Sequence, residues 1–514
     1  MEKPLLITDI MRFAERNYPA VEVVSVTLDN PRHRCTWKDV FRRARQLANA
    51  LAAAGVKPGD RIGSLAWNDY RHLELYYAVS CMGAIMHTIN PRLFPEQLEY
   101  IINHAEDKLL FVDPTLLPAL APLQGKTPSV EKVVLLGSDA TVPEVVKGKL
   151  ESYETFIAGY PDEYDWPELD ERQASSLCYT SGTTGNPKGV LYSHRSNVLH
   201  AYAGCLPDAI GVSGRDTILA VVPMFHANAW GLPYNAAMVG SKVVLPGPKM
   251  GDPETLVSLM NDEHVTLAAG VPTVWTLLLN YLAQTGKKLE TLKSTLVGGS
   301  AVPLSMIETF AEQHGIQVLQ GWGMTEMSPL GTVCSLRPEM ESLPAEERYR
   351  IHTKQGHGVF GVEMKIVDED GKELPWDGKS SGELKVRGNW VCSGYYGLKE
   401  SSAHDADGWF ATGDVAAIGP DGYLQITDRA KDVIKSGGEW ISSVDLENCA
   451  CGHPDVLMAA AIGVKHPKWE ERPILLVVPR QGCTPARDSV LAHIAEHFAK
   501  WQLPDDVILV ESLP

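Results

Sequence analysis

The stretch Tyr179–Gly189, YTSGTTGNPKG, directs the interpretation of the whole chain because it combines hydroxyl side chains, glycines and a single lysine. It follows an apolar segment that ends in LCYT and precedes VLYSH, so we expect a strand that leads into a flexible loop. Such a loop can surround a phosphate group with backbone N–H groups, hydroxyls and one cation. The alternative interpretation is a solvated surface linker.

The loop is not a Walker A phosphate-binding loop. Pro187 precedes Lys188 and removes a backbone donor, and Gly189 stands where a hydroxyl side chain would bind Mg²⁺. Lys188 therefore supplies the cation, and the other groups that can meet a ligand are hydroxyls and glycines. These are Thr180, Ser181, Gly182, Thr183, Thr184 and Gly185.

Composition limits the classes of protein to which the 514-residue chain can belong. It is too long for one ordinary core, so we expect two or more domains. The formal net charge of -18 and the lack of a basic tract disfavour a nucleic-acid partner. Nine cysteines without a disulfide pattern, no signal-peptide pattern and no apolar run of membrane-spanning length predict a cytoplasmic protein without a transmembrane segment.

Strand and helix patterns alternate through the first four-fifths of the chain. Residues 130–137 and 215–224 are typical of buried strands, and residues 94–113 predict a helix that leads into a strand. From about Phe360 onward, apolar and polar residues alternate around glycine-rich turns, which predicts antiparallel strands.

A small C-terminal domain is expected after this antiparallel region. Ser442 and Asp445 have the spacing of a helix-capping box at the start of SSVDLENCA.

Three further motifs follow the loop in a fixed order. They are QGWGMTE at Gln320–Glu326, WFATGD at Trp409–Asp414 and DRAKDVIKSGGEWI at Asp428–Ile441. Together with the loop they resemble the adenylate-forming superfamily, which contains acyl-CoA synthetases, adenylation domains of peptide synthetases and firefly luciferase. Four ordered motifs are far more specific than any one of them, and the resemblance covers nearly the whole chain.

The resemblance implies an α/β fold in two parts. The large N-terminal domain has mixed sheets flanked by helices and a small β-barrel-like subdomain, and a small mobile α+β domain follows it. We expect residues 1–430 to bind ATP and the acyl substrate and residues 431–514 to form the C-terminal lid.

The resemblance also implies ATP, Mg²⁺ and CoA as the small molecules that the protein uses. It makes Glu326 the Mg²⁺ ligand and Thr325 a contact to the α-phosphate, while the loop with Lys188 holds the β- and γ-phosphates. One carboxylate beside the phosphates is chemically sufficient for a hard cation. The alternative for Glu326 is an ordinary surface glutamate.

Further residues are expected to hold the nucleoside. The resemblance implies that Trp322 stacks on adenine, that Asp414 accepts hydrogen bonds from both ribose hydroxyls, and that Arg429 contacts the ribose and phosphates. The alternatives are a core tryptophan and an ordinary surface ion pair. The remaining expected cofactor-binding residues are Gly299, Ser300, Ala301, Gln320 and Gly321.

A hinge is expected at Lys431, where the resemblance implies that the C-terminal domain rotates between two half-reactions. Lys435 is a further candidate catalytic residue. Gly437 and Gly438 would then allow close approach of the pantetheine arm of CoA, although two glycines also suit a simple tight turn.

The acyl pocket is expected around His226, Trp230, Val297, Gly323 and Met324. FHANAW contains no carboxylate to hold a substrate amine, which disfavours an amino acid. A bulky indole at Trp230 would shorten the pocket and favour a small to medium acid, although core packing is an equal alternative for this residue.

Within the superfamily, the sequence as a whole resembles medium-chain fatty acyl-CoA ligases and the 3-methylmercaptopropionate–CoA ligases of dimethylsulfoniopropionate breakdown. We therefore expect an AMP-forming acid–thiol ligase for 3-methylmercaptopropionate, with a medium-chain fatty acid as the alternative substrate.

Other functions stay open. An amino-acid adenylating enzyme is disfavoured by the missing carboxylate, a luciferase-like oxygenase would share all four motifs, and a non-catalytic binding protein would have lost Lys188 or Glu326. The superfamily's Gly-Lys motif, with the adenylation lysine, is expected beyond Pro514 in an omitted tail. The oligomeric state is open, a homodimer included.

Overall fold

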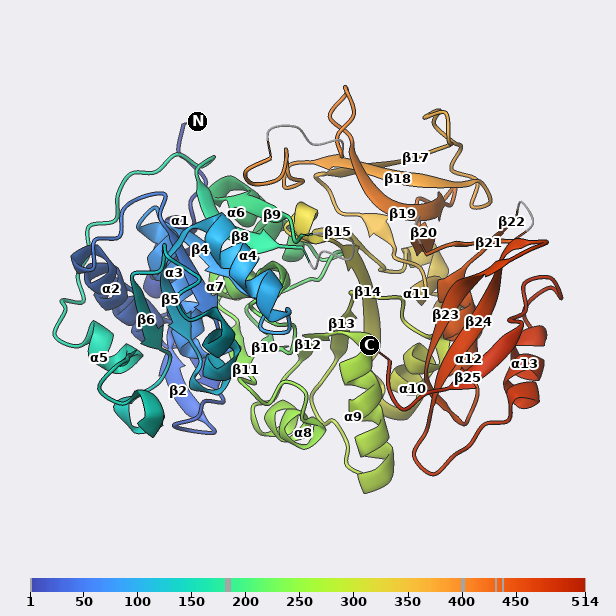
Figure 1. Ribbon diagram of the computed structural model, residues 1–514, viewed down its shortest axis with the longest axis horizontal. Helices are drawn as coiled ribbons and strands as arrows, with labels where there is room; N and C mark the ends of the chain where they lie inside the picture. Colours follow the sequence, from blue (N-terminus) through green and yellow to red (C-terminus); the bar gives the residue numbers. More distant parts are fainter. Residues whose placement is uncertain (1, 181–185, 399–402, 430–431, 437–438, 514) are drawn as a thin grey trace.

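The computed structural model describes residues 2–180, 186–398, 403–429, 432–436 and 439–513. The described residues form two large mixed sheets, a four-stranded antiparallel sheet and a five-stranded C-terminal sheet. Figure 1 shows the two large sheets with their helices over the left and centre, and the two small sheets on the right. The prediction of an α/β fold with a large N-terminal part and a smaller C-terminal part is confirmed.

The first large sheet ends in the strand that carries the loop motif. Its seven strands have the order β7-β6-β5-β3-β4-β8-β9, and only β9 is antiparallel to its neighbour. The strands are β3 (Arg61–Leu65), β4 (Ile85–Thr88), β5 (Asp107–Val112), β6 (Lys132–Leu135), β7 (Glu151–Ser152), β8 (Ala174–Tyr179) and β9 (Gly189–Ser193).

The second large sheet contains the start of the second motif, Gln320–Gly323. Its order is β16-β15-β14-β13-β12-β10-β11-β1-β2, so the first strand of the chain pairs with a strand far along it. The strands are β1 (Glu22–Ser25), β2 (His33–Thr36), β10 (Thr217–Ala220), β11 (Lys242–Leu245), β12 (Leu267–Gly270), β13 (Ser294–Val297), β14 (Gln317–Gly323), β15 (Leu330–Val333) and β16 (His357–Gly358).

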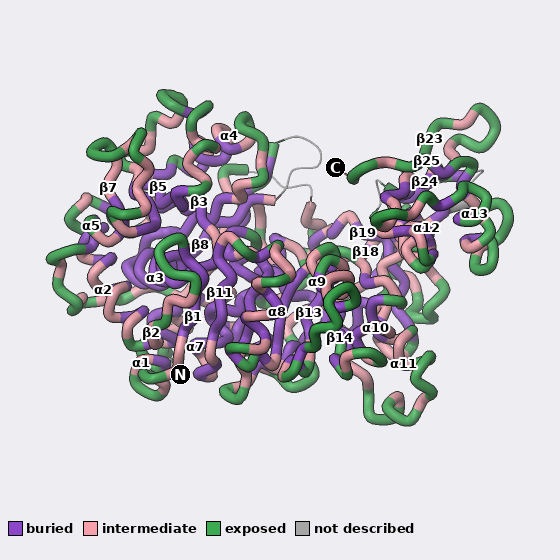
Figure 2. Tube along the Cα trace, turned by 90° about the horizontal axis from the view of Figure 1, so that it is seen from below, coloured by how far each residue is buried: buried purple, intermediate pink, exposed green. Residues whose placement is uncertain are grey.

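Helices fill the space between these sheets and cover their outer faces. One apolar core joins both sheets to α3, of which every residue is buried, while separate cores lie under α4 and under α8 to α10. Figure 2 shows the buried trace running through both sheets. The helices are α1 (Ile7–Asn17), α2 (Trp37–Ala53), α3 (Tyr70–Cys81), α4 (Pro95–Ala105), α5 (Tyr153–Ile157), α6 (His194–Gly204), α7 (Leu232–Val239), α8 (Pro253–Asp262), α9 (Pro272–Thr285), α10 (Leu304–His314) and α11 (Ala345–His352).

The antiparallel strands predicted after Phe360 are confirmed. They form the sheet β17-β18-β19-β20, with β17 and β20 at its two ends, so the expected small subdomain is built on a four-stranded antiparallel sheet. The strands are β17 (Val362–Val367), β18 (Ser381–Gly388), β19 (Phe410–Ile418) and β20 (Leu424–Arg429).

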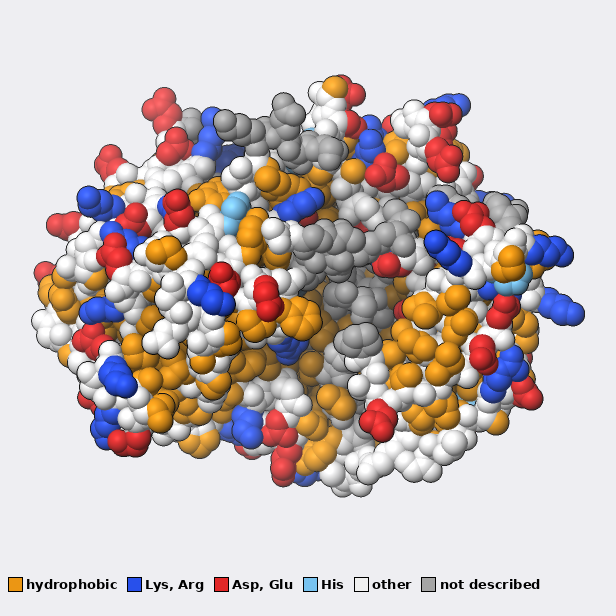
Figure 3. All heavy atoms as spheres, in the orientation of Figure 1, with side chains coloured by type: hydrophobic (Ala, Val, Ile, Leu, Met, Phe, Trp, Pro, Cys, Tyr) orange, Lys and Arg blue, Asp and Glu red, His pale blue; other side chains and the backbone are white. Residues whose placement is uncertain are grey.

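The C-terminal sheet has its own core against two helices. The Ser442 hydroxyl accepts a hydrogen bond from the Asp445 N–H at the start of α12, as the spacing predicts. Figure 3 shows apolar side chains gathered over this part of the molecule, where Ile462 and Ile508 are exposed. The elements are β21 (Ile434–Ser436), β22 (Glu439–Ile441), α12 (Ser443–Cys451), β23 (Val456–His466), β24 (Glu470–Pro479), α13 (Arg487–Ala495) and β25 (Asp506–Leu509).

Two predictions, the domain boundary and the lack of a transmembrane segment, can be compared with the described chain. Residues 430 and 431, where we expect the two domains to meet, lie outside the described residues. No helix within the described ranges has the length and apolar character needed to cross a membrane.

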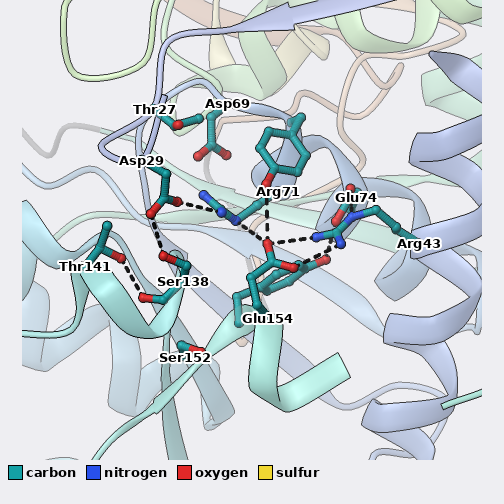
Figure 4. A network of polar contacts seen from close by, with 12 residues as sticks. Thr27, Asp29, Arg43, Asp69, Arg71, Glu74, Ser138, Thr141, Ser152 and Glu154 are labelled. Carbon is teal, nitrogen blue, oxygen red and sulfur yellow. Dashed lines mark hydrogen bonds and ion pairs between the residues drawn. The ribbon is translucent and has the colours of Figure 1, made fainter. Parts of the chain in front are cut away.

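A buried ion network ties α2, α3 and α5 together (Figure 4). Arg43 Nε lies 2.7 Å from Glu74 Oε1, and the Arg43 guanidinium also contacts Glu154 at 3.0 Å. Arg71 Nε lies 2.8 Å from Glu154 Oε1, and Arg71 Nη2 lies 2.7 Å from Asp29 Oδ2. The Glu74 side chain is fully buried, so this network compensates a charge that water cannot reach.

Candidate active site

Three of the motifs are far apart in the chain but lie close together in space, where β14 of one sheet meets β19 and β20 of another.

 β14 belongs to the nine-stranded sheet, while β19 and β20 are neighbours in the antiparallel sheet, where Asp414 pairs directly with Arg429. The Trp322 indole N–H donates a 3.0 Å hydrogen bond to Asp414 Oδ2, and Arg429 Nε lies 2.9 Å from Asp414 Oδ1. Three of the motifs thus meet at one carboxylate.

Asp414 is a buried acid held by these two donors. Its side chain is 2% exposed, and burial raises its pKa above the ordinary value of 3.8, while the Arg429 charge and the Trp322 N–H oppose that rise. Both carboxylate oxygens already accept a donor, so a ribose would have to share or replace the contact from Arg429, whose side chain is 51% exposed.

A cavity of about 560 Å³ opens beside this carboxylate. Its opposite walls are α9 of the large part and α12 with β23 of the C-terminal part, and Arg480 Nη1 donates to Asn280 Oδ1 across it at 3.1 Å. Nine of the predicted site residues line it: Gly299, Ser300, Ala301, Gln320, Gly321, Trp322, Gly323, Asp414 and Arg429. The volume and the mixed polar and apolar walls suit a nucleotide-sized ligand.

The described ends of the loop motif are joined to each other. The Lys188 N–H donates to the Thr180 hydroxyl at 3.2 Å, and the Thr180 N–H donates to the Lys188 carbonyl at 2.9 Å. Lys188 is exposed, so its ammonium can reach a ligand. The rest of the predicted loop, residues 181–185, lies outside the described residues.

Lys188 and Glu326, the two charged residues predicted to lie at the phosphates, both contact Tyr395, which the sequence interpretation missed. Lys188 Nζ lies 4.8 Å from the centroid of the Tyr395 ring, and the Tyr395 hydroxyl donates a 2.7 Å hydrogen bond to Glu326 Oε1. A second missed residue, Tyr192, donates its hydroxyl to the carbonyl of Thr325 at 2.6 Å. Neither tyrosine stands in one of the four motifs, so only their contacts identify them.

The predicted acyl residues surround a smaller pocket of about 60 Å³. His226, Trp230, Gly323 and Met324 line it, and no carboxylate does among the described lining residues. A Cβ atom built on Gly298 would lie 3.2 Å from Cη2 of Trp230, so the indole lies directly against this glycine in the wall of the pocket.

Trp230 reaches this position from an unusual turn. Ala227, Asn228, Ala229 and Trp230 all have φ between 43° and 55°, a left-handed conformation that residues with a Cβ rarely adopt in succession. The buried Asn228 side chain holds the turn by donating to the Ser176 hydroxyl of β8 at 3.0 Å.

Several predicted residues are not brought into these pockets. Val297 is fully buried in the apolar core under α8 to α10, because alternate residues of a strand point to opposite faces of the sheet. The expectation that Val297 lines the acyl pocket is therefore corrected. Lys435 is exposed on β21 and donates its N–H to Glu471 Oε2, away from both cavities. Lys431, Gly437 and Gly438 lie outside the described residues.

The residues present fit a magnesium ion shared with phosphates. Within the described ranges, no three His, Cys, Asp or Glu side chains gather into a group that could hold a metal alone. Glu326 offers one buried carboxylate, four residues after Trp322, which lines the larger cavity. Mg²⁺ is commonly held by one or two carboxylates together with substrate phosphates and water, so this donor set is sufficient.

Comparisons with known proteins agree with this geometry. A family model described as AMP-binding enzyme matches residues 12–396, and one described as AMP-binding enzyme C-terminal domain matches residues 445–514. The solved structure of the anthranilate CoA ligase AuaEII in complex with anthranoyl-AMP has a TM-score of 0.88 and 26% identity, and the match covers 100% of this chain and 95% of that one.

Two relatives match over the full length of this chain. The 3-methylmercaptopropionyl-CoA ligase of Ruegeria lacuscaerulensis is 51% identical, with 95% of that protein covered. The medium-chain-fatty-acid–CoA ligase of Ectopseudomonas oleovorans is 49% identical, with 94% covered. The fold and the cleft thus define the adenylate-forming class of enzyme, as the four motifs predict. The chain belongs to the AMP-binding enzyme family.

Proposed function

We propose that this protein is an AMP-forming acid–thiol ligase that converts a small to medium carboxylic acid into its CoA thioester, with 3-methylmercaptopropionate as the substrate. The observation that carries the proposal is the meeting of Lys188 and Glu326 at Tyr395, beside a cleft that holds the Trp322–Asp414–Arg429 contacts. The 51% identity to a 3-methylmercaptopropionyl-CoA ligase supports the choice of acid.

In the first half-reaction, an oxygen of the substrate carboxylate attacks the α-phosphorus of ATP and pyrophosphate leaves. Asp414 and Trp322 hold the nucleoside, Thr325 contacts the α-phosphate, and Lys188 meets the outer phosphates. Glu326 would hold Mg²⁺, which supplies positive charge to the phosphates when bound. The protein contributes mainly by positioning the reactants and offsetting charge.

In the second half-reaction, the thiol of CoA attacks the acyl carbon of the mixed anhydride and AMP leaves. The C-terminal part rotates about Lys431 to present the segment around Gly437 and Gly438 to the cleft. Lys435 moves with this segment as a further candidate, and the rotation lets one cleft serve both steps.

A medium-chain fatty acid is the second candidate substrate. The pocket beneath Trp230 is apolar and carries no carboxylate among its described lining residues, which suits an alkyl chain as well as a thioether. The relative from Ectopseudomonas oleovorans supports this alternative. An α-amino acid fits less well, because its ammonium would be left without a counter-charge.

The cellular setting belongs to the same proposal. Nine free thiols suit a reduced compartment and support a cytoplasmic location. If the thioether acid is the substrate, the protein acts in dimethylsulfoniopropionate breakdown. The proposal also includes a homodimer, which light scattering of the purified protein tests.

The proposed function is tested by pyrophosphate release with a panel of acids, with and without CoA. We expect acid-dependent release from the wild-type protein, and thioester formation only when CoA is present. Release that no acid stimulates would reject the proposal.

Glu326→Gln tests the charged end of the site. The change keeps the side chain's size but removes the charge expected to meet the cation, so pyrophosphate release should fall by roughly 100-fold or more. Glu341→Gln, at an exposed position, is the matched control and should leave the rate unchanged. Near-wild-type release from Glu326→Gln would remove Glu326 from the site.

A further inference from the structure

Tyr395 touches both charged groups of the phosphate site, one with its ring and one with its hydroxyl. The 4.8 Å distance from Lys188 Nζ to the ring centroid is within the range of a cation–π contact. The 2.7 Å bond from the hydroxyl to Glu326 Oε1 is a charge-assisted hydrogen bond. A single side chain therefore fixes the spacing between a cation and an anion.

The main chain around Tyr395 is anchored to the segments that carry both charges. The Cys392 N–H donates to the carbonyl of Glu326 at 2.7 Å, and the Tyr396 N–H donates to the carbonyl of Gly189 at 2.8 Å. Gly189 follows Lys188 directly, so the backbone bonds hold Tyr395 between its two partners. This placement does not depend on the flexibility of the Lys188 side chain.

The tyrosine also keeps the two charges from neutralising each other. Among the described residues, no ion pair joins Lys188 to Glu326, although both contact the same tyrosine side chain. A direct pair would compete with the triphosphate for the lysine and with a cation for the carboxylate. The ring occupies one side of the ammonium and leaves its other donors for phosphate oxygens.

We propose that Tyr395 is a positioning residue that prepares Lys188 for the triphosphate and Glu326 for its cation, an inference that rests on the proposed function. The hydroxyl fixes Oε1 of Glu326, and no hydrogen bond to Oε2 is found within the described chain, so Oε2 is the oxygen that would be left for the cation. The ring holds the Lys188 ammonium where the outer phosphates bind. The two tasks belong to different parts of one side chain, so substitutions can separate them.

Tyr395→Phe removes the hydroxyl and keeps the ring. Binding of a non-hydrolysable ATP analogue, measured by calorimetry in EDTA, should stay within about 2-fold of wild type because the ring still holds Lys188. The Mg²⁺ concentration that half-saturates the analogue-bound protein should rise by about 10-fold or more, the equivalent of one lost hydrogen bond to a charged group. The KM for the acid should not change.

Tyr395→Leu removes both parts. It should show the same change in Mg²⁺ dependence, and its binding of the analogue in EDTA should also weaken by about 2- to 5-fold, as expected for one lost cation–π contact. Tyr396→Phe is the matched control, because the neighbouring tyrosine uses its backbone to contact Gly189 and its ring to pack on His104. The control should bind Mg²⁺ and nucleotide as the wild type does.

The outcomes separate this proposal from the proposed function. Unchanged Mg²⁺ dependence in folded Tyr395→Phe, or tighter analogue binding in Tyr395→Leu, would overturn the role of Tyr395 while acid-dependent pyrophosphate release by the wild type would still support the ligase. If Tyr395→Phe does not fold, as judged by thermal melting, the Leu variant decides by the same two titrations. A Glu326→Gln background adds a final check, since Tyr395→Phe should have no further effect on Mg²⁺ there.

Discussion

At the scale of single residues, Trp230 combines a strained backbone with a position in the wall of the smaller pocket. Each left-handed residue with a Cβ costs roughly 1–2 kcal/mol, and four of them precede Gly231. Strain of this kind persists where surrounding contacts hold it, here through Asn228, and it gathers at functional sites. The turn directs the indole onto Gly298, and we expect the indole to limit the length of the pocket.

Trp230→Ala should therefore lengthen the range of acids that the protein accepts. In the wild type, kcat/KM should rise over the shortest acids, since each buried methylene adds roughly 0.8 kcal/mol, and then collapse where the chain meets the indole. The variant should move this collapse to longer chains. The measurement is a kcat/KM series from propionate to palmitate, with 3-methylmercaptopropionate beside it.

Trp376→Ala, which removes an exposed indole far along the chain, is the control and should leave the series unchanged. A wild-type preference for palmitate would contradict the closed pocket, and an unchanged profile in Trp230→Ala would make Trp230 a packing residue.

Site residues that stand in the motifs could be predicted from the sequence. Site residues that only their spatial contacts identify, such as Tyr395, could not. Trp322, Asp414 and Arg429 stand in three recognisable motifs and do meet in space. Tyr395 has no such pattern, because its two partners lie about 70 and 200 residues away and only the sheet arrangement unites them. Val297 shows the opposite error, since its neighbours line the pocket while strand alternation turns it into the core.

At the scale of elements, local patterns gave correct helices and strands. The predicted helix and strand in residues 94–113 are α4 and β5, because Pro95 and the apolar spacing act over a few residues. The order of strands within each sheet depends on packing between distant segments, which local patterns do not encode. The ion network of α2, α3 and α5 could not be predicted from local patterns either, because Arg43, Glu74 and Glu154 are far apart in the chain.

Arg43→Leu should destabilise the protein by about 3–5 kcal/mol, because it leaves the Glu74 carboxylate buried without its cation. Burial already raises the pKa of Glu74 above its ordinary value of 4.5, with Arg43 opposing the rise. A raised folded-state pKa favours the protonated form, so stability falls as pH rises through it. The loss should thus be larger at pH 8 than at pH 5, as measured by the midpoint of urea unfolding.

Lys147→Ala provides the contrast. It removes an exposed pair with Glu144, which should contribute less than about 1 kcal/mol at either pH. Equal and small effects of both substitutions would show that the buried network does not stabilise these helices.

At the scale of the whole molecule, the larger cavity is lined by residues of the large part and of the C-terminal part, so a change in their relative position would change access to it. Lys431→Pro should separate the half-reactions, because proline fixes φ and blocks rotation at that residue. Pyrophosphate release with acid and ATP should continue, while thioester formation fails. Lys431→Ala is the control and should support both, and equal losses in both steps for the proline variant would exclude a hinge at Lys431.

The pairing of β1 with β11 also has a consequence for how the chain is made. Ser25 leaves the ribosome long before Lys242, about 10–40 s earlier at ordinary rates of translation. Through that interval the first hairpin, β1 with β2, has no neighbour on its inner edge, while all strands of the seven-stranded sheet, β3 to β9, are synthesised before β11. The edge of β1 therefore stays unpaired during synthesis, and the nascent chain is most exposed to incorrect strand pairing until β11 emerges and pairs with that edge.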